Sequence, residues 1–280
     1  MGTVSQLTRA RAVQWARQSI DRLDARLLLQ FVCGCTANAL IADPDVVLDE
    51  AQSIAFQSLV HRRQAGEPLA YLIGQAGFYG DLLTVTADVL VPRPETEDLV
   101  DWALEVLRDR VAPKIADLGT GSGAIALALA GARPDAQIVA VDVSTAALSV
   151  AAGNRQQLGR NNVEFVCANW YEGWASAESL DVIVSNPPYI AHQDPHLTQG
   201  DLRFEPVSAL TDYASGLSCL ESIIAGADQY LKPGGLIAVE HGFDQSEAVV
   251  GLMKESGLID IQVHLDLAGH CRAASGRKRL

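Results

Sequence analysis

The sequence predicts an α/β fold, in which an open and mostly parallel sheet follows a small helical bundle. Apolar residues in the first 75 positions recur every three or four residues, the spacing of amphipathic helices. From position 99 onward, short β-branched runs alternate with helical ones, which is typical of a doubly wound sheet. A glycine-rich turn directly follows one of these strand-like runs. We therefore expect two domains.

The helical part contains two apolar stripes. The first covers residues 12–32 and predicts a helix there, and residues 48–59 repeat the spacing. Gly34 and Gly66 follow the two stripes, where glycine commonly ends a helix in the left-handed conformation. Residues 1–75 are therefore expected to form a helical domain.

A β-hairpin is predicted next. Aromatic and β-branched residues surround Gly80 and Asp81, and Pro92 and Pro94 end the run. We interpret residues 76–92 as a hairpin linker that leads into a sheet domain of residues 93–280. The strand-like runs of that domain are residues 115–118, 138–143, 163–169, 181–186 and 236–241, the last of them after a turn at 232–235.

The glycine turn predicts a ligand site. Without Cβ atoms, a ligand can approach the backbone and face the N-terminus of the next helix. Asp142 ends the following strand-like run, where a carboxylate can accept hydrogen bonds from ribose hydroxyls. Trp170 follows the run after that, and it either stacks on an adenine ring or belongs to the core. The turn itself consists of Gly119, Thr120, Gly121, Ser122 and Gly123.

The spacing of these glycines does not distinguish between adenosyl ligands. It fits a dinucleotide such as NAD as well as S-adenosylmethionine. A turn that only packs a helix against a strand is the alternative without a ligand.

A second motif, Asn186-Pro187-Pro188-Tyr189, follows the run at 181–185. The prolines remove two backbone donors, so carbonyl oxygens stay free, while the asparagine side chain adds an acceptor and the tyrosine an aromatic face. An amide or exocyclic NH₂ group is a poor nucleophile because its lone pair is delocalised. Acceptors at Asn186 and Pro187 would localise that lone pair, and Tyr189 would pack on the planar group. A rigid turn without chemistry is the alternative.

The composition of the chain limits the classes of partner that the protein can bind. The net charge of −13 argues against a protein whose task is to grip a phosphate backbone. The excess lies beyond position 80, because residues 1–80 hold seven basic and seven acidic side chains. The chain shows no signal-peptide layout and no long apolar run, so we expect a cytoplasmic protein without a membrane partner. The five cysteines lack metal-ligand spacing, and we predict no metal site.

Several segments together resemble the release-factor glutamine methyltransferases. They are GFYG at 77–80, VPRPETE at 91–97, DLGTGSGAIALALA at 117–130, VDVS at 141–144, NPPYI at 186–190, FEPVSAL at 204–210 and LKPGGLIAVEHG at 231–242. The NPPY motif alone is shared with DNA and RNA amino-methyltransferases, whereas PRPETE with a helical N-terminal domain is narrower. The resemblance covers nearly the whole chain.

This resemblance implies a Rossmann-like class I methyltransferase sheet and transfer of a methyl group from S-adenosylmethionine. The acceptor would be the side-chain nitrogen (N5) of the glutamine in the Gly-Gly-Gln loop of class 1 peptide-chain release factors, and the helical domain would help to dock that protein. Residues 119–123, Asp142 and Trp170, together with Asn186, would bind the cofactor. Residues 186–189 would bind the glutamine, with Asn186, Pro187 and Tyr189 acting in catalysis.

One position departs from the family pattern. Asn169 stands where an aspartate is common, so a neutral group would replace a charged one near the adenine. Two other functions stay open from the residues. A nucleic-acid amino-methyltransferase faces the same nucleophile problem but should carry a basic groove or a recognition domain. An inactive adenosyl-binding module would have no need of an intact NPPY motif.

Overall fold

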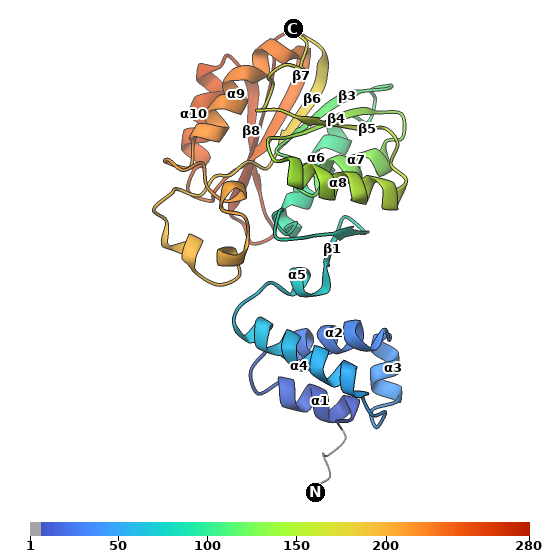
Figure 1. Cartoon of the computed structure of the whole chain (residues 1–280). Coiled ribbons are helices and arrows are strands. Elements are labelled where there is room, and N and C mark those ends of the chain that lie inside the picture. Colours follow the sequence, from blue (N-terminus) through green and yellow to red (C-terminus); the bar gives the residue numbers. More distant parts are fainter. Residues whose placement is uncertain (1–6) are drawn as a thin grey trace, which may run out of the picture. The chain divides into compact units, whose positions relative to one another are not determined.

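The computed structural model describes residues 7–280. These residues form two units, and the boundary along the chain lies between Gly74 and Gln75. The first unit is helical (Figure 1), and the second contains both sheets found in the described part of the chain. Among the described residues, no helix combines the length and the apolar character needed to cross a membrane.

The first unit packs its helices around Leu28, Leu29, Phe56 and Val60, which are fully buried. Gly34 ends α2 in the left-handed conformation at a φ of 59°, as its place after the stripe predicts. The helices are α1 (Arg9–Ala16), α2 (Arg22–Cys33), α3 (Ala37–Ala42), α4 (Glu50–Gln64) and α5 (Leu69–Ile73).

The prediction of one helix over residues 12–32 is wrong, because α1 and α2 divide this stretch. The apolar spacing continues across the break, so periodicity alone does not detect it. Asp21 adopts an extended backbone, and its side chain accepts a hydrogen bond from the Leu23 N–H at 2.6 Å. A local cap of this kind starts a new helix even where the apolar stripe is unbroken.

The second unit is built on a seven-stranded sheet in the order β5-β4-β3-β6-β7-β9-β8. The first five of these strands are parallel, and β9 runs antiparallel to both β7 and β8. This confirms the doubly wound sheet predicted from the alternation of runs. The strands are β3 (Lys114–Leu118), β4 (Gln137–Asp142), β5 (Val163–Cys167), β6 (Leu180–Ser185), β7 (Leu231–Glu240), β8 (Ile259–Leu265) and β9 (Cys271–Arg277).

Helices cover both faces of the sheet (Figure 1). Side chains alternate along the strands, so Ile115 packs with α6 and α7 on one face, whereas Ala116 packs with α9 and α10 on the other. The helices of this unit are α6 (Glu97–Val106), α7 (Ala124–Ala132), α8 (Thr145–Leu158), α9 (Ser218–Tyr230) and α10 (Ser246–Glu255). Short 3₁₀ turns are η1 (Pro94–Thr96), η2 (Pro195–Thr198), η3 (Leu202–Phe204) and η4 (Val207–Ala209).

Residues 232–235, predicted as a turn before the fifth strand-like run, lie within β7. Leu180 of β6 pairs with Leu231, but Val182 pairs with Leu236, so a bulge takes up the extra residues of β7. The glycines and the proline therefore interrupt the register without ending the strand.

The hairpin of β1 (Gln75–Phe78) and β2 (Asp81–Thr84) belongs to the second unit. Tyr79 and Gly80 form its turn at φ values of 48° and 79°, the combination that a tight type I′ hairpin requires. Asn154 of α8 accepts from the Thr84 N–H at 2.7 Å and donates to the Thr84 carbonyl at 3.0 Å. Phe78 of the hairpin is buried in the sheet core, so the hairpin is an integral part of the sheet unit.

Candidate active site

Three neighbouring strands end together at one edge of the sheet. Leu118 of β3 pairs with Val141 of β4 and with Ser185 of β6. The order reverses at β3, because the chain runs outward through β4 to β5 and returns to β6 on the other side. Open α/β sheets bind ligands at such a switch point. Gly119 follows β3, Asp142 is the last residue of β4, and Asn186 follows β6.

Gly119 and Gly121 leave the backbone of the turn accessible. Gly119 has a φ of 78°, and a Cβ there would lie 3.5 Å from the Trp170 ring. Gly121 has a φ of 56° with no atom within 4 Å of a Cβ position, and its N–H donates to Asp142 Oδ2 at 2.9 Å. Side chains at either position would be strained in the left-handed region.

Gly123 has a different role. A Cβ on it would lie 3.0 Å from Leu127 and 3.2 Å from Ala151, so this glycine lets α7 pack closely. Its φ of 85° starts α7 directly after the turn.

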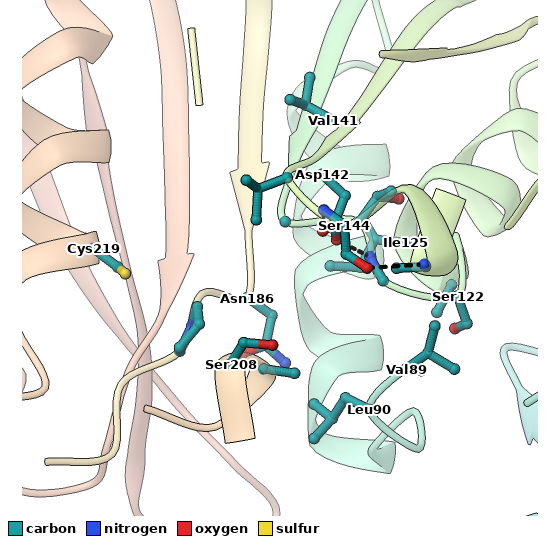
Figure 2. A pocket seen from close by; sticks show the side chains of 18 of the residues that line it. Val89, Leu90, Ser122, Ile125, Val141, Asp142, Ser144, Asn186, Ser208 and Cys219 are labelled. Carbon is teal, nitrogen blue, oxygen red and sulfur yellow. Dashed lines mark hydrogen bonds between the residues drawn. The ribbon is translucent and has the colours of Figure 1, made fainter. Parts of the chain in front are cut away.

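A cavity of about 320 Å³ opens at this edge (Figure 2), within the range of small-molecule sites. It brings together most of the residues that the sequence predicts for the site. The predicted residues that line it are Gly119, Thr120, Gly121, Ser122, Asp142, Trp170, Asn186 and Pro188. Gly123, Pro187 and Tyr189 do not line it.

A chain of hydrogen bonds holds the Asn186 side chain. Asn186 Nδ2 donates to Thr96 Oγ1 at 3.0 Å, and Thr96 Oγ1 donates to Glu240 Oε2 at 2.7 Å. The Tyr189 hydroxyl donates to the other oxygen of Glu240 at 3.1 Å. Within residues 7–280, the side-chain oxygen of Asn186 and the carbonyl of Pro187 have no hydrogen-bond partner. Two acceptors are therefore free at the end of β6.

Known families match both parts of the chain. Residues 8–74 match the family model described as the PrmC N-terminal domain, and residues 99–201 match the Methyltransferase small domain. A release factor glutamine methyltransferase of Bordetella pertussis is 48% identical over 93% of this chain and 96% of its own length. Those of Burkholderia pseudomallei (44% identical, 96% of both chains) and Salmonella typhimurium (41%, 94% and 97%) are similar over the same extent.

The chain belongs to the release factor glutamine methyltransferases. This membership confirms the resemblance that the sequence motifs indicate, and it identifies the protein as a methyltransferase that uses S-adenosylmethionine. The full-length match also means that the helical first unit is a regular part of the family's architecture.

A buried carboxyl group, Asp117, and a half-buried one, Asp142, adjoin the glycine turn of this methyltransferase. Asp117 Oδ2 accepts from Thr120 Oγ1 at 2.6 Å and from the Ala126 N–H at 3.1 Å, while its Oδ1 is buried and has no hydrogen-bond partner among the described residues. Burial raises the pKa of Asp117 to about 6, and it raises that of Asp142 as well. These groups brace the turn, and Asp142 keeps further acceptor capacity beyond its bonds to the N–H groups of Gly121 and Ser144.

Trp170 lies over the turn in a constrained backbone conformation. Its φ is 49°, and its carbonyl accepts from the Trp174 indole N–H at 2.7 Å. The neighbouring Asn169, which departs from the family pattern, is exposed and donates to Glu172 at 3.2 Å. Its amide is thus engaged with a side chain of its own turn.

Three residues of the site were absent from the sequence prediction: Asp117, Thr96 and Glu240. All three lie in segments that carry the family resemblance, so those segments marked the positions without indicating their roles. Asp117 has a local signal, because it stands two residues before the first glycine. Thr96 and Glu240 have none, since they are 144 residues apart and meet only through the fold.

Proposed function

We propose that this enzyme transfers a methyl group from S-adenosylmethionine to the side-chain nitrogen (N5) of the glutamine in the Gly-Gly-Gln loop of class 1 release factors. The observation that carries the proposal is the pair of free acceptors at the end of β6, beside the glycine turn. Release factors act at the ribosome, so we expect the reaction to take place in the cytoplasm.

The acceptors suit a glutamine amide. Its nitrogen carries two hydrogens, and its lone pair is delocalised into the carbonyl group. Asn186 Oδ1 and the Pro187 carbonyl can each accept one N–H, which raises the electron density on nitrogen and orients its lone pair. Tyr189, held by Glu240, supports this end of the site from outside the cavity.

The other side of the cavity suits the cofactor. S-adenosylmethionine supplies an electrophilic methyl group on a positively charged sulfur. The accessible backbone at Gly119 and Gly121 would hold it, Asp142 would accept from its ribose hydroxyls, and Trp170 would border its adenine.

The substrate class is tested by transfer of labelled methyl groups. Incubation with a class 1 release factor should place label on the loop glutamine, whereas the same factor with Gln→Ala in the loop, and duplex or single-stranded DNA, should stay unlabelled. Mass spectrometry of the loop peptide checks the position. Label on DNA, or equal label on the glutamine variant, would show that the acceptor is another group.

We further propose that the first unit docks the release factor. Its surface exposes large apolar side chains that are not part of its own core. Phe31 on α2 and Ile54 on α4 are each at least half exposed. Residues 1–80 carry no net charge, whereas the remainder is strongly acidic, so this part of the chain suits a protein surface.

Replacing both Phe31 and Ile54 with serine should raise KM for the release factor by about 30- to 900-fold, since truncated interface anchors cost roughly 1–2 kcal/mol each and every 1.4 kcal/mol is a factor of ten. The kcat should stay unchanged because both residues lie outside the sheet unit. Initial rates at several release-factor concentrations separate the two constants. Val111→Ser, at a residue 91% exposed in the second unit, is the matched control. A drop in kcat at unchanged KM would contradict the docking role.

A further inference from the structure

The hydrogen bonds around Glu240 run in one direction. An ionised carboxylate has no hydrogen to donate, so Glu240 accepts from Tyr189 on one oxygen and from Thr96 on the other. A threonine hydroxyl has a single hydrogen. Once Thr96 donates it to Glu240, its oxygen can only accept from the next group in the chain, which is Asn186.

This direction determines how the Asn186 amide is oriented. Its NH₂ group must face Thr96, as the 3.0 Å contact from Nδ2 shows. The side-chain oxygen of Asn186 is then the group that remains free to accept a hydrogen bond at the end of β6. If the amide were reversed, an NH₂ group would meet the N–H groups of the substrate, and no hydrogen bond would form there.

We propose that Glu240, acting through Thr96, is a positioning residue that orients the Asn186 amide with its oxygen toward the substrate nitrogen. This inference rests on the proposed function. Glu240 ends β7 and Asn186 follows β6, so the two strands bring the carboxylate and the amide to the same edge, and Thr96 of η1 bridges them. Neither Glu240 nor Tyr189 lines the cavity, so they act from behind its wall.

The surroundings of Glu240 make the orientation of the Asn186 amide sensitive to pH. The side chain is nearly inaccessible to solvent, and burial raises its pKa to about 7. The charged groups that act on it are Arg272 of β9, which lowers the pKa, and Glu95 of η1, which raises it. A protonated Glu240 can donate to Thr96, and Thr96 can then donate to a reversed Asn186 amide. Ionised Glu240 is therefore the form that keeps the required direction.

Three variants test the proposal, and two of them, Glu240→Gln and Thr96→Val, keep the volume of the original side chain. Glu240→Gln keeps the size of the side chain but adds an NH₂ group that can donate to Thr96. We expect kcat at pH 8 to fall by about 10- to 100-fold, the usual effect of removing a residue that orients a catalytic group. Thr96→Val, which lacks the hydroxyl, should behave alike, whereas Thr96→Ser should retain most of the activity. Titration with S-adenosylhomocysteine should give unchanged affinity in all three, which also reports on folding.

The pH profile and a double variant distinguish positioning from general support. Wild-type kcat should rise as pH increases through about 7, and Glu240→Gln should lack this rise. The variant carrying both Thr96→Val and Glu240→Gln should be no slower than either single variant, because both act through the same amide. Any of three results would overturn the proposal. They are wild-type activity in Glu240→Gln, additive losses of kcat in the double variant, and an equal loss of kcat in Thr96→Ser and Thr96→Val.

A readout without substrate separates this inference from the proposed function. The side-chain NH₂ resonances of Asn186, assigned by their loss in Asn186→Ala, should shift as pH passes through about 7 in the wild type and stay constant in Glu240→Gln. Constant resonances in the wild type would refute the positioning role even if the release factor is methylated. Failure to label the release factor would refute the proposed function, while the NMR result still decides the positioning role.

Discussion

Replacing Asn186 with alanine should lower kcat for release-factor methylation by about 10³-fold, the upper range for losing one hydrogen-bonding group that acts on the reacting centre. The substitution removes the side-chain oxygen and leaves the backbone at the end of β6 in place. Affinity for S-adenosylhomocysteine should change little, because the glycine turn and Asp142 are untouched. Single-turnover rates with saturating release factor, together with calorimetric titration of S-adenosylhomocysteine, measure the two effects separately.

The matched control is Asn161→Ala, an exposed asparagine ahead of β5, which should keep wild-type kcat. Should Asn186→Ala transfer methyl groups at the wild-type rate, the acceptor mechanism is incorrect. Loss of S-adenosylhomocysteine binding in parallel with kcat would instead assign Asn186 mainly to the cofactor, which was the second role that the sequence predicted for it.

Glu240→Gln is expected to stabilise the second unit at alkaline pH although it impairs catalysis. The pKa of Glu240 rises from 4.5 to about 7 on folding because the ionised side chain is buried. The folded protein thus holds a proton between these pH values that the unfolded chain has released. The stabilisation that comes from this bound proton is complete below pH 4.5 and is lost as pH rises through 7. At about 1.4 kcal/mol for each pKa unit, the loss is about 3 kcal/mol.

Urea unfolding at pH 5 and pH 8 checks this expectation. Both proteins should carry Trp15→Phe, so that fluorescence reports only on Trp102, Trp170 and Trp174 of the second unit. Between these two pH values the free energy of unfolding should fall by about 2.5 kcal/mol less in Glu240→Gln than in the wild type. Asp117, whose pKa is also raised, is present in both proteins and cancels.

Glu255→Gln, at an exposed glutamate that ends α10, serves as the control and should follow the wild type at both pH values. An equal pH dependence in the wild type and Glu240→Gln would mean that Glu240 is not held in the buried and costly environment that the structure shows. If instead Glu240→Gln loses less stability than the wild type, this difference and the kinetic test together would show that the enzyme gives up stability at neutral pH in order to orient Asn186.

Local sequence signals were sufficient for the elements that short-range physics controls. The glycine turn between β3 and α7, the end of α2 at Gly34 and the hairpin turn at Gly80 each depend on a few neighbouring residues, and each was predicted. The break between α1 and α2 was missed because the apolar stripe continues through Ile20, although α1 ends at Ala16 and the cap at Asp21 starts a new helix.

The two motifs and the type of chemistry that each supports can be recognised from the residues alone, because strand, turn and helix signals are local. The pairing of β3 with β6, which brings Gly119 and Asn186 to one cavity, becomes visible only in the folded chain. Only the fold joins Asn186 to Thr96, 90 positions away, and Thr96 to Glu240. Hydrogen bonds over such separations depend on which strands pair, and strand pairing is set by packing of the whole sheet rather than by any periodicity along the chain.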